Sequence, residues 1–231
     1  MNFKAEVLAK KQLANEVFEL DLKLIEPQKI DFQAGQFVQL LVSEKEKREY
    51  SIITPPQQDS AVSFCVNVSP MGPGSKYIGA LKVGDIVQFE GPHGLFVVRA
   101  QDRDKDQLFI ATGTGIAPFK SMILDLLQNS FENKITLLFG VRSESESFYF
   151  REFEELAKKY SNFDFVPCLS RPSAGWQGFH GRVTDFLRQN IERYKDRPVY
   201  ICGGPPVIKD VRSILISNGF SSANIRLEIF T

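Results

Sequence analysis

The stretch that decides the fold is Leu-Phe-Ile-Ala-Thr-Gly-Thr-Gly-Ile-Ala-Pro, residues 108–118. Its first four residues form an apolar run of the length of a short buried strand. Beyond the two glycines, apolar residues recur at helical spacing at Phe119, Met122, Ile123, Leu126 and Leu127. A glycine turn between a strand and a helix presents backbone N–H groups at the positive helix end, where a phosphate binds. The stretch therefore predicts a strand, a phosphate loop and a helix, although Pro118 stands where the full dinucleotide fingerprint has a third glycine.

The same alternation of strand and helix continues to the end of the chain. Short apolar runs typical of buried strands occupy residues 135–141, 163–169, 199–202 and 225–229. Between them, apolar residues at helical spacing predict helices around residues 150–160, 183–187 and 207–215. Strands that alternate with helices indicate a doubly wound α/β fold with a parallel sheet.

The first part of the chain, from Phe3 to about Val98, has a different pattern. Its strand-like segments are short, and glycines and prolines separate them. Many short strands at such a spacing predict an antiparallel β-barrel. One short helix is expected to begin near Ser75, which is a good capping residue. The polar residues 100–106 are interpreted as a linker, so that the predicted domains are 1–101 and 107–231.

Composition and charge argue against several classes of function. The 231 residues carry 28 basic and 28 acidic side chains, so that nothing indicates binding to nucleic acid or to a membrane surface. No apolar run approaches the length of a transmembrane helix and the first residues have no signal-peptide core, which predicts a cytoplasmic protein. Three scattered cysteines and two histidines predict neither a disulfide framework nor a metal site, whether an iron–sulfur cluster or zinc. Redox chemistry would therefore need an organic cofactor.

Two segments of the first part combine into an anion site. Arg48-Glu49-Tyr50-Ser51 lies in a strand-like run, and Gly72-Pro73-Gly74-Ser75 precedes the expected helix. The N–H groups at the start of a helix attract a phosphate, and an arginine on a neighbouring strand would complete a diphosphate clamp. Each segment alone is better explained by ordinary structure, the first as a strand with two faces and the second as a capped helix.

Further candidate residues stand where strands of the second part end. Cys202-Gly203-Gly204-Pro205 follows one strand and leads into a helix, and Arg142 and Ser170-Arg171 follow two others. Ligands of open parallel sheets bind at the carboxyl ends of the strands, so these turns and the phosphate loop are expected on one edge. A lone buried cysteine is usually an inert packing group, but the glycine turn beside Cys202 favours a function there.

Taken in order, six motifs of this chain resemble those of the ferredoxin–NADP reductase family. They are Arg-x-Tyr-Ser (48–51), Gly-x-x-Ser (72–75), Gly-Pro-x-Gly-x-Phe (91–96), Gly-Thr-Gly-Ile-Ala-Pro (113–118), Cys-Gly-Gly-Pro (202–205) and Glu-x-Phe (228–230). The resemblance covers essentially the whole chain, and several motifs in one order are more specific than any single one. It implies a flavin-binding barrel followed by a domain that binds a nicotinamide nucleotide.

For the flavin, the resemblance implies FAD rather than FMN, held without a covalent bond. Tyr50 would stack on the flavin ring and Arg48 would bind the diphosphate. Gly74 and Ser75 would complete the diphosphate site, and Ser51 would lie near the reactive nitrogen N5.

For the nucleotide, the resemblance implies that four residues after the first strand form the cradle: Thr112, Gly113, Thr114 and Gly115. Cys202, with Gly203 beside it, would lie against the nicotinamide and help to set the angle of hydride transfer. Arg142, Ser170 and Arg171 would meet phosphates or ribose. Ser170-Arg171 resembles the pair of NADP-linked members, which favours NADPH over NADH, although Pro172 makes a simple turn the alternative.

Glu228 and Phe230 match the carboxyl-terminal Glu-x-aromatic of the family. Glu228 would supply a proton or hold Ser51, which makes Cys202, Ser51 and Glu228 the candidate catalytic residues. Phe230 would shield the flavin until the nicotinamide displaces it. The plant enzymes end with a tyrosine at this point, whereas Thr231 follows here, and Phe230 is as well explained as the last residue of a buried strand.

The function implied is that of an NAD(P)H-dependent oxidoreductase that passes electrons through FAD to a separate carrier. Ferredoxin or flavodoxin is the expected carrier, because no iron–sulfur domain is expected in this chain. The alternatives are a reductase of free flavin or another small acceptor, and the reductase component of a multi-protein oxygenase or hydrogenase. The phosphate loop and Cys202 argue against a flavin-binding relay without turnover.

Overall fold

The computed structural model describes residues 1–69 and 71–230 of the chain. Contacts divide the chain into two compact units, Met1–Val98 with Ala117–Asn129, and Arg99–Ile116 with Ser130–Thr231. These units are discontinuous in sequence, so they do not test the predicted domain limits. The limits 1–101 and 107–231 stay a prediction.

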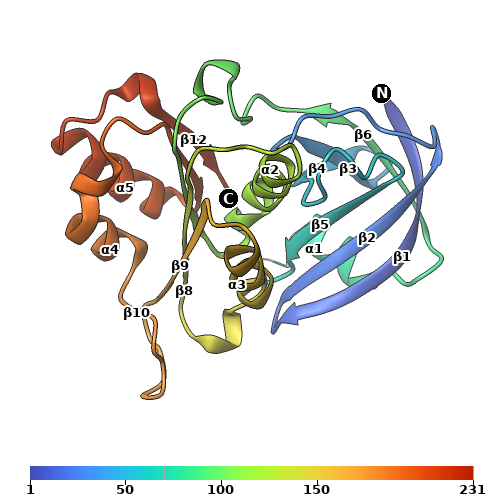
Figure 1. The fold of residues 1–231 in the computed structure, drawn as a ribbon. Coiled ribbons are helices and arrows are strands. Elements are labelled where there is room, and N and C mark those ends of the chain that lie inside the picture. Colours follow the sequence, from blue (N-terminus) through green and yellow to red (C-terminus); the bar gives the residue numbers. More distant parts are fainter. Residues whose placement is uncertain (70, 231) are drawn as a thin grey trace. The chain divides into compact units, whose positions relative to one another are not determined.

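The first unit contains the antiparallel sheet predicted from the sequence (Figure 1). Its strands are β1 (Asn2–Ala14), β2 (Val17–Glu26), β3 (Phe37–Ser43), β4 (Glu46–Ser51), β5 (Ala61–Asn67) and β6 (Ile86–His93). Their order is β4-β3-β6-β1-β2-β5, and each neighbouring pair is antiparallel. A single bridge between Ile52, just after β4, and Phe64 on β5 joins the two outer strands. The sheet thus closes into the expected barrel.

The barrel core follows from the alternation of side chains along each strand. In β1 the side chains of Phe3, Ala5 and Val7 are buried, as a period of two requires. The helix α1 (Pro73–Ala80) adds Ile78 to this core. The expectation that Ser75 caps this helix was wrong. Gly72 is the N-cap residue with Pro73 directly after it, because a proline at the first helical position already has the backbone angle and the missing N–H that suit a helix start.

The helix α2 (Ala117–Gln128) also belongs to the first unit. The Ser121 hydroxyl donates a hydrogen bond to the Thr54 carbonyl oxygen at 2.7 Å, and the Gln57 amide donates to the Asp125 carboxylate at 2.8 Å. The rings of Phe96 and Phe119 pack at 5.7 Å between centroids. Polar and apolar contacts therefore attach α2 to the barrel.

The second unit contains a six-stranded sheet in which all neighbouring strands are parallel. The strands are β7 (Gln107–Thr112), β8 (Ile135–Val141), β9 (Phe163–Leu169), β10 (Phe179–His180), β11 (Val199–Gly203) and β12 (Ile225–Ile229), in the order β10-β9-β8-β7-β11-β12. The helices are α3 (Phe150–Lys159), α4 (Val183–Asn190) and α5 (Pro205–Ser217). The doubly wound α/β fold predicted from the sequence is confirmed; only the two-residue β10 was not anticipated.

The strand order places a topological switch at β7. The chain runs from β7 to β8 on one side, and later returns to β11 on the other. In open parallel sheets, the carboxyl ends of strands at such a switch form the ligand site. The 3₁₀ turn Gly113–Ile116 follows β7, and Gly203-Gly204 end β11, so both glycine turns lie at this point.

Residues 100–106, interpreted as a linker, are more ordered than their polar sequence indicates. Residues Ala100–Asp102 form a 3₁₀ turn, and the Asp102 side chain is buried. Its carboxylate accepts a hydrogen bond from the Tyr200 hydroxyl at 3.1 Å. From sequence alone, a charged residue such as Asp102 is expected to be exposed to solvent. Its burial is possible here because polar partners distant in sequence satisfy its carboxylate.

None of the helices in the described part of the chain has the length and apolar character needed to cross a bilayer.

Candidate cofactor-binding sites

In the first unit, the start of α1 lies directly against β4. A Cβ atom on Gly74 would stand 2.5 Å from the Tyr50 hydroxyl oxygen and 3.0 Å from Cγ of Arg48. Only glycine permits this approach without a shift of its neighbours. The structure therefore brings together Arg48, Tyr50 and Gly74, with Ser75 next in the helix.

The Tyr50 ring lies between the barrel core and the surface. It packs against Phe64 with 6.0 Å between ring centroids and is half-buried. Burial raises the pKa of Tyr50 to about 12, although the Arg48 charge opposes the shift. The phenol is therefore neutral at working pH, and a neutral, partly exposed aromatic ring is suited to stacking on a planar ligand.

Arg48 provides the positive charge of this site. Its Nη2 atom pairs with the Glu46 carboxylate at 2.5 Å, its Nη1 atom donates to the Lys47 carbonyl oxygen at 2.8 Å, and its side chain is 40% exposed. Among the residues that the structure describes, no side chain caps α1, and no acidic residue lies in its first turn. A helix start and a guanidinium group fit a diphosphate, which would compete with Glu46 for Arg48.

Ser51, the last residue of β4, is buried and pairs with Phe37 of β3. It belongs to the first unit, whereas Cys202 and Glu228 belong to the second.

In the second unit, the two glycine turns touch through their backbones. A Cβ atom on Gly115 would stand 2.5 Å from the carbonyl oxygen of Cys202, and one on Gly203 would stand 2.4 Å from Oγ1 of Thr112. Gly113 has a φ of +54° with open space around its missing Cβ, a conformation that other residues rarely adopt. Four predicted residues, Thr112, Gly113, Gly115 and Gly203, are thus brought to one place, with Thr114 in the same turn.

Cys202 and Glu228 are neighbours across β11 and β12, where the two strands pair in register. The Cys202 side chain is 0% exposed. Burial first, and the Glu228 carboxylate second, raise the pKa of the Cys202 thiol well above its ordinary value. The thiol is therefore a protonated packing and contact group and not a nucleophile. The Phe230 amide donates to the Gly203 carbonyl oxygen at 3.0 Å, which holds the end of the chain at the same turn.

Arg142, Ser170 and Arg171 also meet at this edge of the sheet. The Arg171 amide donates to the Arg142 carbonyl oxygen at 2.7 Å, and the Ser170 amide donates to Val141 at 3.2 Å. Both arginine side chains are exposed. Two cations are thereby held on adjacent loops, which suits a phosphate group.

Sequence reasoning missed Glu144, which joins the same two loops. Its carboxylate accepts hydrogen bonds from the Ser173 hydroxyl at 2.7 Å and the Ser173 amide at 2.9 Å, and these bonds lower the pKa of Glu144. Sequence reasoning also missed Glu46, the partner of Arg48. No pattern in the sequence marks either carboxylate, because each partner choice depends on loop geometry. Among the described residues, no group of three or more His, Cys, Asp or Glu side chains could hold a metal ion.

Comparisons with known proteins match both units. Residues 4–98 match the family of oxidoreductase FAD-binding domains, and residues 109–213 match the family of oxidoreductase NAD-binding domains.

Among curated proteins, the chain is 35% identical to the phenol 2-monooxygenase reductase component DmpP of Pseudomonas sp. (strain CF600), over 99% of this chain and 65% of that protein. It is 28% identical to reductase component 1 of terephthalate 1,2-dioxygenase from Comamonas sp., over 99% of this chain and 68% of that protein. The chain thus spans about two thirds of the length of these relatives.

Among solved structures, the Amycolatopsis reductase GcoB superposes with a TM-score of 0.91 and 25% identity, over 100% of this chain and 70% of that one. The ferredoxin NADP⁺ reductase from Neisseria gonorrhoeae with bound FAD and NADP gives a TM-score of 0.85 at 24% identity, over 99% and 98% of the two chains. The second likeness concerns the fold alone.

Proposed function

We propose, from the premise that this chain belongs to the FAD- and NAD-binding oxidoreductases of the ferredoxin–NADP reductase type, that it moves electrons from NAD(P)H through FAD to a separate redox protein. The acceptor is a carrier such as a ferredoxin or flavodoxin, or a further component of an oxygenase. Relatives named as reductase components of two oxygenases favour a protein acceptor over free flavin.

The observation that carries the proposal is the backbone contact between Gly115 and Cys202. This contact joins the phosphate loop to the strand end that holds Cys202 beside Glu228. A nucleotide whose diphosphate lies on Gly113–Ile116 would have protein groups of the right kind within reach of its nicotinamide. The contact is a property of the second unit alone.

A bound FAD would supply the capacity to accept a hydride from reduced nicotinamide and to release electrons singly, which is chemistry that the protein itself lacks. Tyr50 stacks on its ring system, and Arg48 with the start of α1 binds its diphosphate. Cys202 orients the nicotinamide, and Glu228 holds or supplies a proton. Orientation of this kind can lower a barrier by several kcal/mol, up to about 7–11 in well-oriented intramolecular reactions.

The direct test uses the purified protein. The flavin released on denaturation is expected to be FAD, and its yellow colour is expected to bleach when NADPH or NADH is added without oxygen. Reoxidation by ferredoxin, flavodoxin, free FMN and quinone then ranks the acceptors. Release of FMN only, or a colour that neither nucleotide bleaches, would refute the proposal.

We further propose that NADPH is preferred over NADH. Arg142 and Arg171 lie on adjacent loops, joined by the hydrogen bond between their backbones. Two exposed guanidinium groups attract the 2′-phosphate, and Ser170 adds a hydroxyl donor where an acidic residue would repel it.

The test of this preference is the ratio of kcat/KM for NADPH to kcat/KM for NADH. Arg171→Ala should lower the ratio by about tenfold, a loss of about 1.4 kcal/mol in transition-state binding. The control is Arg188→Ala, which removes an exposed arginine on α4 that pairs with Asp185. A wild-type ratio of one or below, or a ratio that Arg171→Ala leaves unchanged, would remove the assignment.

A further inference from the structure

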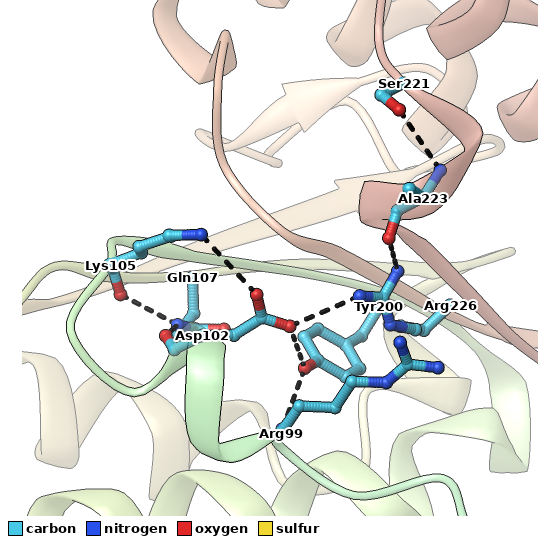
Figure 2. A network of polar contacts seen from close by, with 8 residues as sticks. All are labelled: Arg99, Asp102, Lys105, Gln107, Tyr200, Ser221, Ala223 and Arg226. Carbon is cyan, nitrogen blue, oxygen red and sulfur yellow. Dashed lines mark hydrogen bonds and ion pairs between the residues drawn. The ribbon is translucent and has the colours of Figure 1, made fainter.

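A buried polar network lies beside the strand pair that carries Cys202 and Glu228. Figure 2 shows the Asp102 carboxylate between the Tyr200 hydroxyl and the Arg226 guanidinium group. All of its residues belong to the second unit. The side chains of Asp102, Tyr200 and Arg226 are only 1%, 0% and 8% exposed.

The contacts of the network tie three segments together. The Asp102 carboxylate accepts from the Tyr200 hydroxyl at 3.1 Å and pairs with Nη2 of Arg226 at 3.4 Å. The Tyr200 hydroxyl also accepts from the Arg99 amide at 3.2 Å, and Nη1 of Arg226 donates to the Ala223 carbonyl oxygen. The network therefore fastens the segment after Val98 and the turn before β12 to the strand β11 (Figure 2).

The register of the strands places this network one row from the candidate catalytic pair. Tyr200 pairs with Arg226, and two residues further on Cys202 pairs with Glu228. Because side chains alternate between the two faces of a sheet, all four lie on the same face. A shift of β12 that breaks one pair must also disturb the other.

Apart from Ile225, which packs in the core, the strand β12 is weakly covered. It is an edge strand, paired with β11 over five residues, and the Leu227 and Ile229 side chains of its other face are exposed. A buried ion pair contributes less to net stability than apolar packing of similar size, but it can specify one arrangement among several. Within the described chain, Nε of Arg226 and Oε1 of Gln107 have no hydrogen-bond partner, so the burial has a cost that packing alone would avoid.

We infer that Arg226, paired with the Asp102 carboxylate that also accepts from Tyr200, is a positioning residue that keeps β12 in register, so that Cys202 stays covered and Glu228 stays beside it. The effect on strand register follows from the geometry of the second unit alone. Only the effect on hydride transfer rests on the proposed function.

The first test measures how fast a thiol reagent modifies each cysteine, with mass spectrometry of the peptides as readout. Arg226→Met keeps the apolar part of the side chain and removes its charge. Modification of Cys202 should become at least about tenfold faster, because local opening of β12 exposes it. Cys168 is an internal control, since it is equally buried in the same sheet but lies on β9.

The matched control variant is Arg197→Met. Nη2 of Arg197 pairs with Asp106 at 3.1 Å, so this pair also ties the segment before β7 to the region before β11, but it does not involve β12. Arg197→Met should leave the Cys202 rate unchanged. Equal rates for Cys202 in Arg226→Met and wild type, or an equal rise in Cys168, would overturn the inference.

The second test measures flavin reduction in a stopped-flow instrument. Arg226→Met should retain full FAD, because Tyr50 and Arg48, the residues proposed to bind the flavin ring and diphosphate, lie in the first unit, and should reduce its flavin about tenfold more slowly at saturating nucleotide. Arg226→Lys should recover part of the rate. If Arg226→Met does not fold, Tyr200→Phe removes one hydroxyl and should show both effects more weakly. Wild-type rates in a folded, FAD-loaded variant would overturn the inference, whereas a wild-type protein that no nucleotide bleaches would refute the proposed function and leave the thiol test in force.

Discussion

The two candidate sites differ in whether side chains or backbone groups form them. In the first unit, side chains form the site: the half-exposed Tyr50 ring and the Arg48 guanidinium group lie against the start of α1. In the second unit, backbone turns form the site, and the thiol of Cys202 is fully buried. The first unit matches the FAD-binding family and the second the NAD-binding family, so the side-chain site is the one proposed for the flavin and the backbone site the one proposed for the nucleotide.

The largest expected effect is the loss of flavin in Arg48→Ala. Removing a charged hydrogen-bond donor should weaken FAD binding by about 1.5–3 kcal/mol, and Tyr50→Phe should weaken it less because the ring remains. Equilibrium titration of the apoprotein with FAD measures both. Lys47→Ala, which removes the neighbouring exposed charge paired with Glu90, is the control. Equal losses of FAD affinity in all three variants would contradict specific roles for Arg48 and Tyr50 in FAD binding.

A second effect should be confined to the backbone site. Gly115→Ala would place a Cβ atom 2.5 Å from the Cys202 carbonyl oxygen, so that one of two backbone segments must move. We expect a loss of about 1–3 kcal/mol in the free energy of unfolding, together with weaker nucleotide binding and unchanged FAD content. Gly175→Ala is the control, since nothing in the described chain lies within 4 Å of the added atom and Gly175 is not in either glycine turn of the site. Unchanged nucleotide affinity in Gly115→Ala would contradict the close contact.

A smaller effect should separate chemistry from binding. Cys202→Ala should slow hydride transfer by about tenfold at saturating nucleotide and leave FAD binding intact, because a contact made at the reacting carbon affects the catalytic constant. Stopped-flow reduction without oxygen provides the rate. Cys168→Ala removes a thiol of equal burial elsewhere in the sheet and should not slow the reaction. If both variants match the wild type, Cys202 serves packing only.

The most general effect concerns alkaline pH. Burial raises the pKa of Cys168 from 9.0 to about 12 and that of Tyr200 from 10.0 to about 12. Groups with a raised pKa in the folded state stabilise it below the unfolded pKa, and this stability is lost as pH rises through the folded pKa. The second unit should therefore lose stability from about pH 9 upward, and the first unit, where Tyr50 titrates from 10.0 to about 12, only from about pH 10.

Fluorescence of Trp176, the single tryptophan, reports on the second unit, and denaturant titrations at several pH values give its stability. Cys168→Ala should reduce the loss between pH 9 and 12. A second unit that is equally stable at pH 8 and pH 11 would contradict the assignment of these shifts.

The elements of both units were predictable because their apolar residues repeat with the period of a strand or of a helix. The closeness of the two glycine turns of the second unit was predictable because chain direction alone puts the carboxyl ends of parallel strands on one edge. What could not be predicted depends on partners far apart in sequence. The sequence indicates that Asp102 belongs to a polar linker, because its partners Tyr200 and Arg226 are about 100 residues away or more. It likewise indicates that α2 belongs with the parallel sheet, because the hydrogen bond from Ser121 to Thr54 has no signature in the sequence.

The burial of the three cysteines has a consequence for the durability of the protein in air. Proteins that carry electrons on a flavin leak some of them to oxygen, and the peroxide formed attacks thiolates far faster than thiols. Cys65, Cys168 and Cys202 are all buried, and the pKa values of the last two are raised, so that little thiolate is present at neutral pH. If the proposed function holds, we therefore expect peroxide formed during turnover to oxidise the exposed Met1 and Met71 before any cysteine.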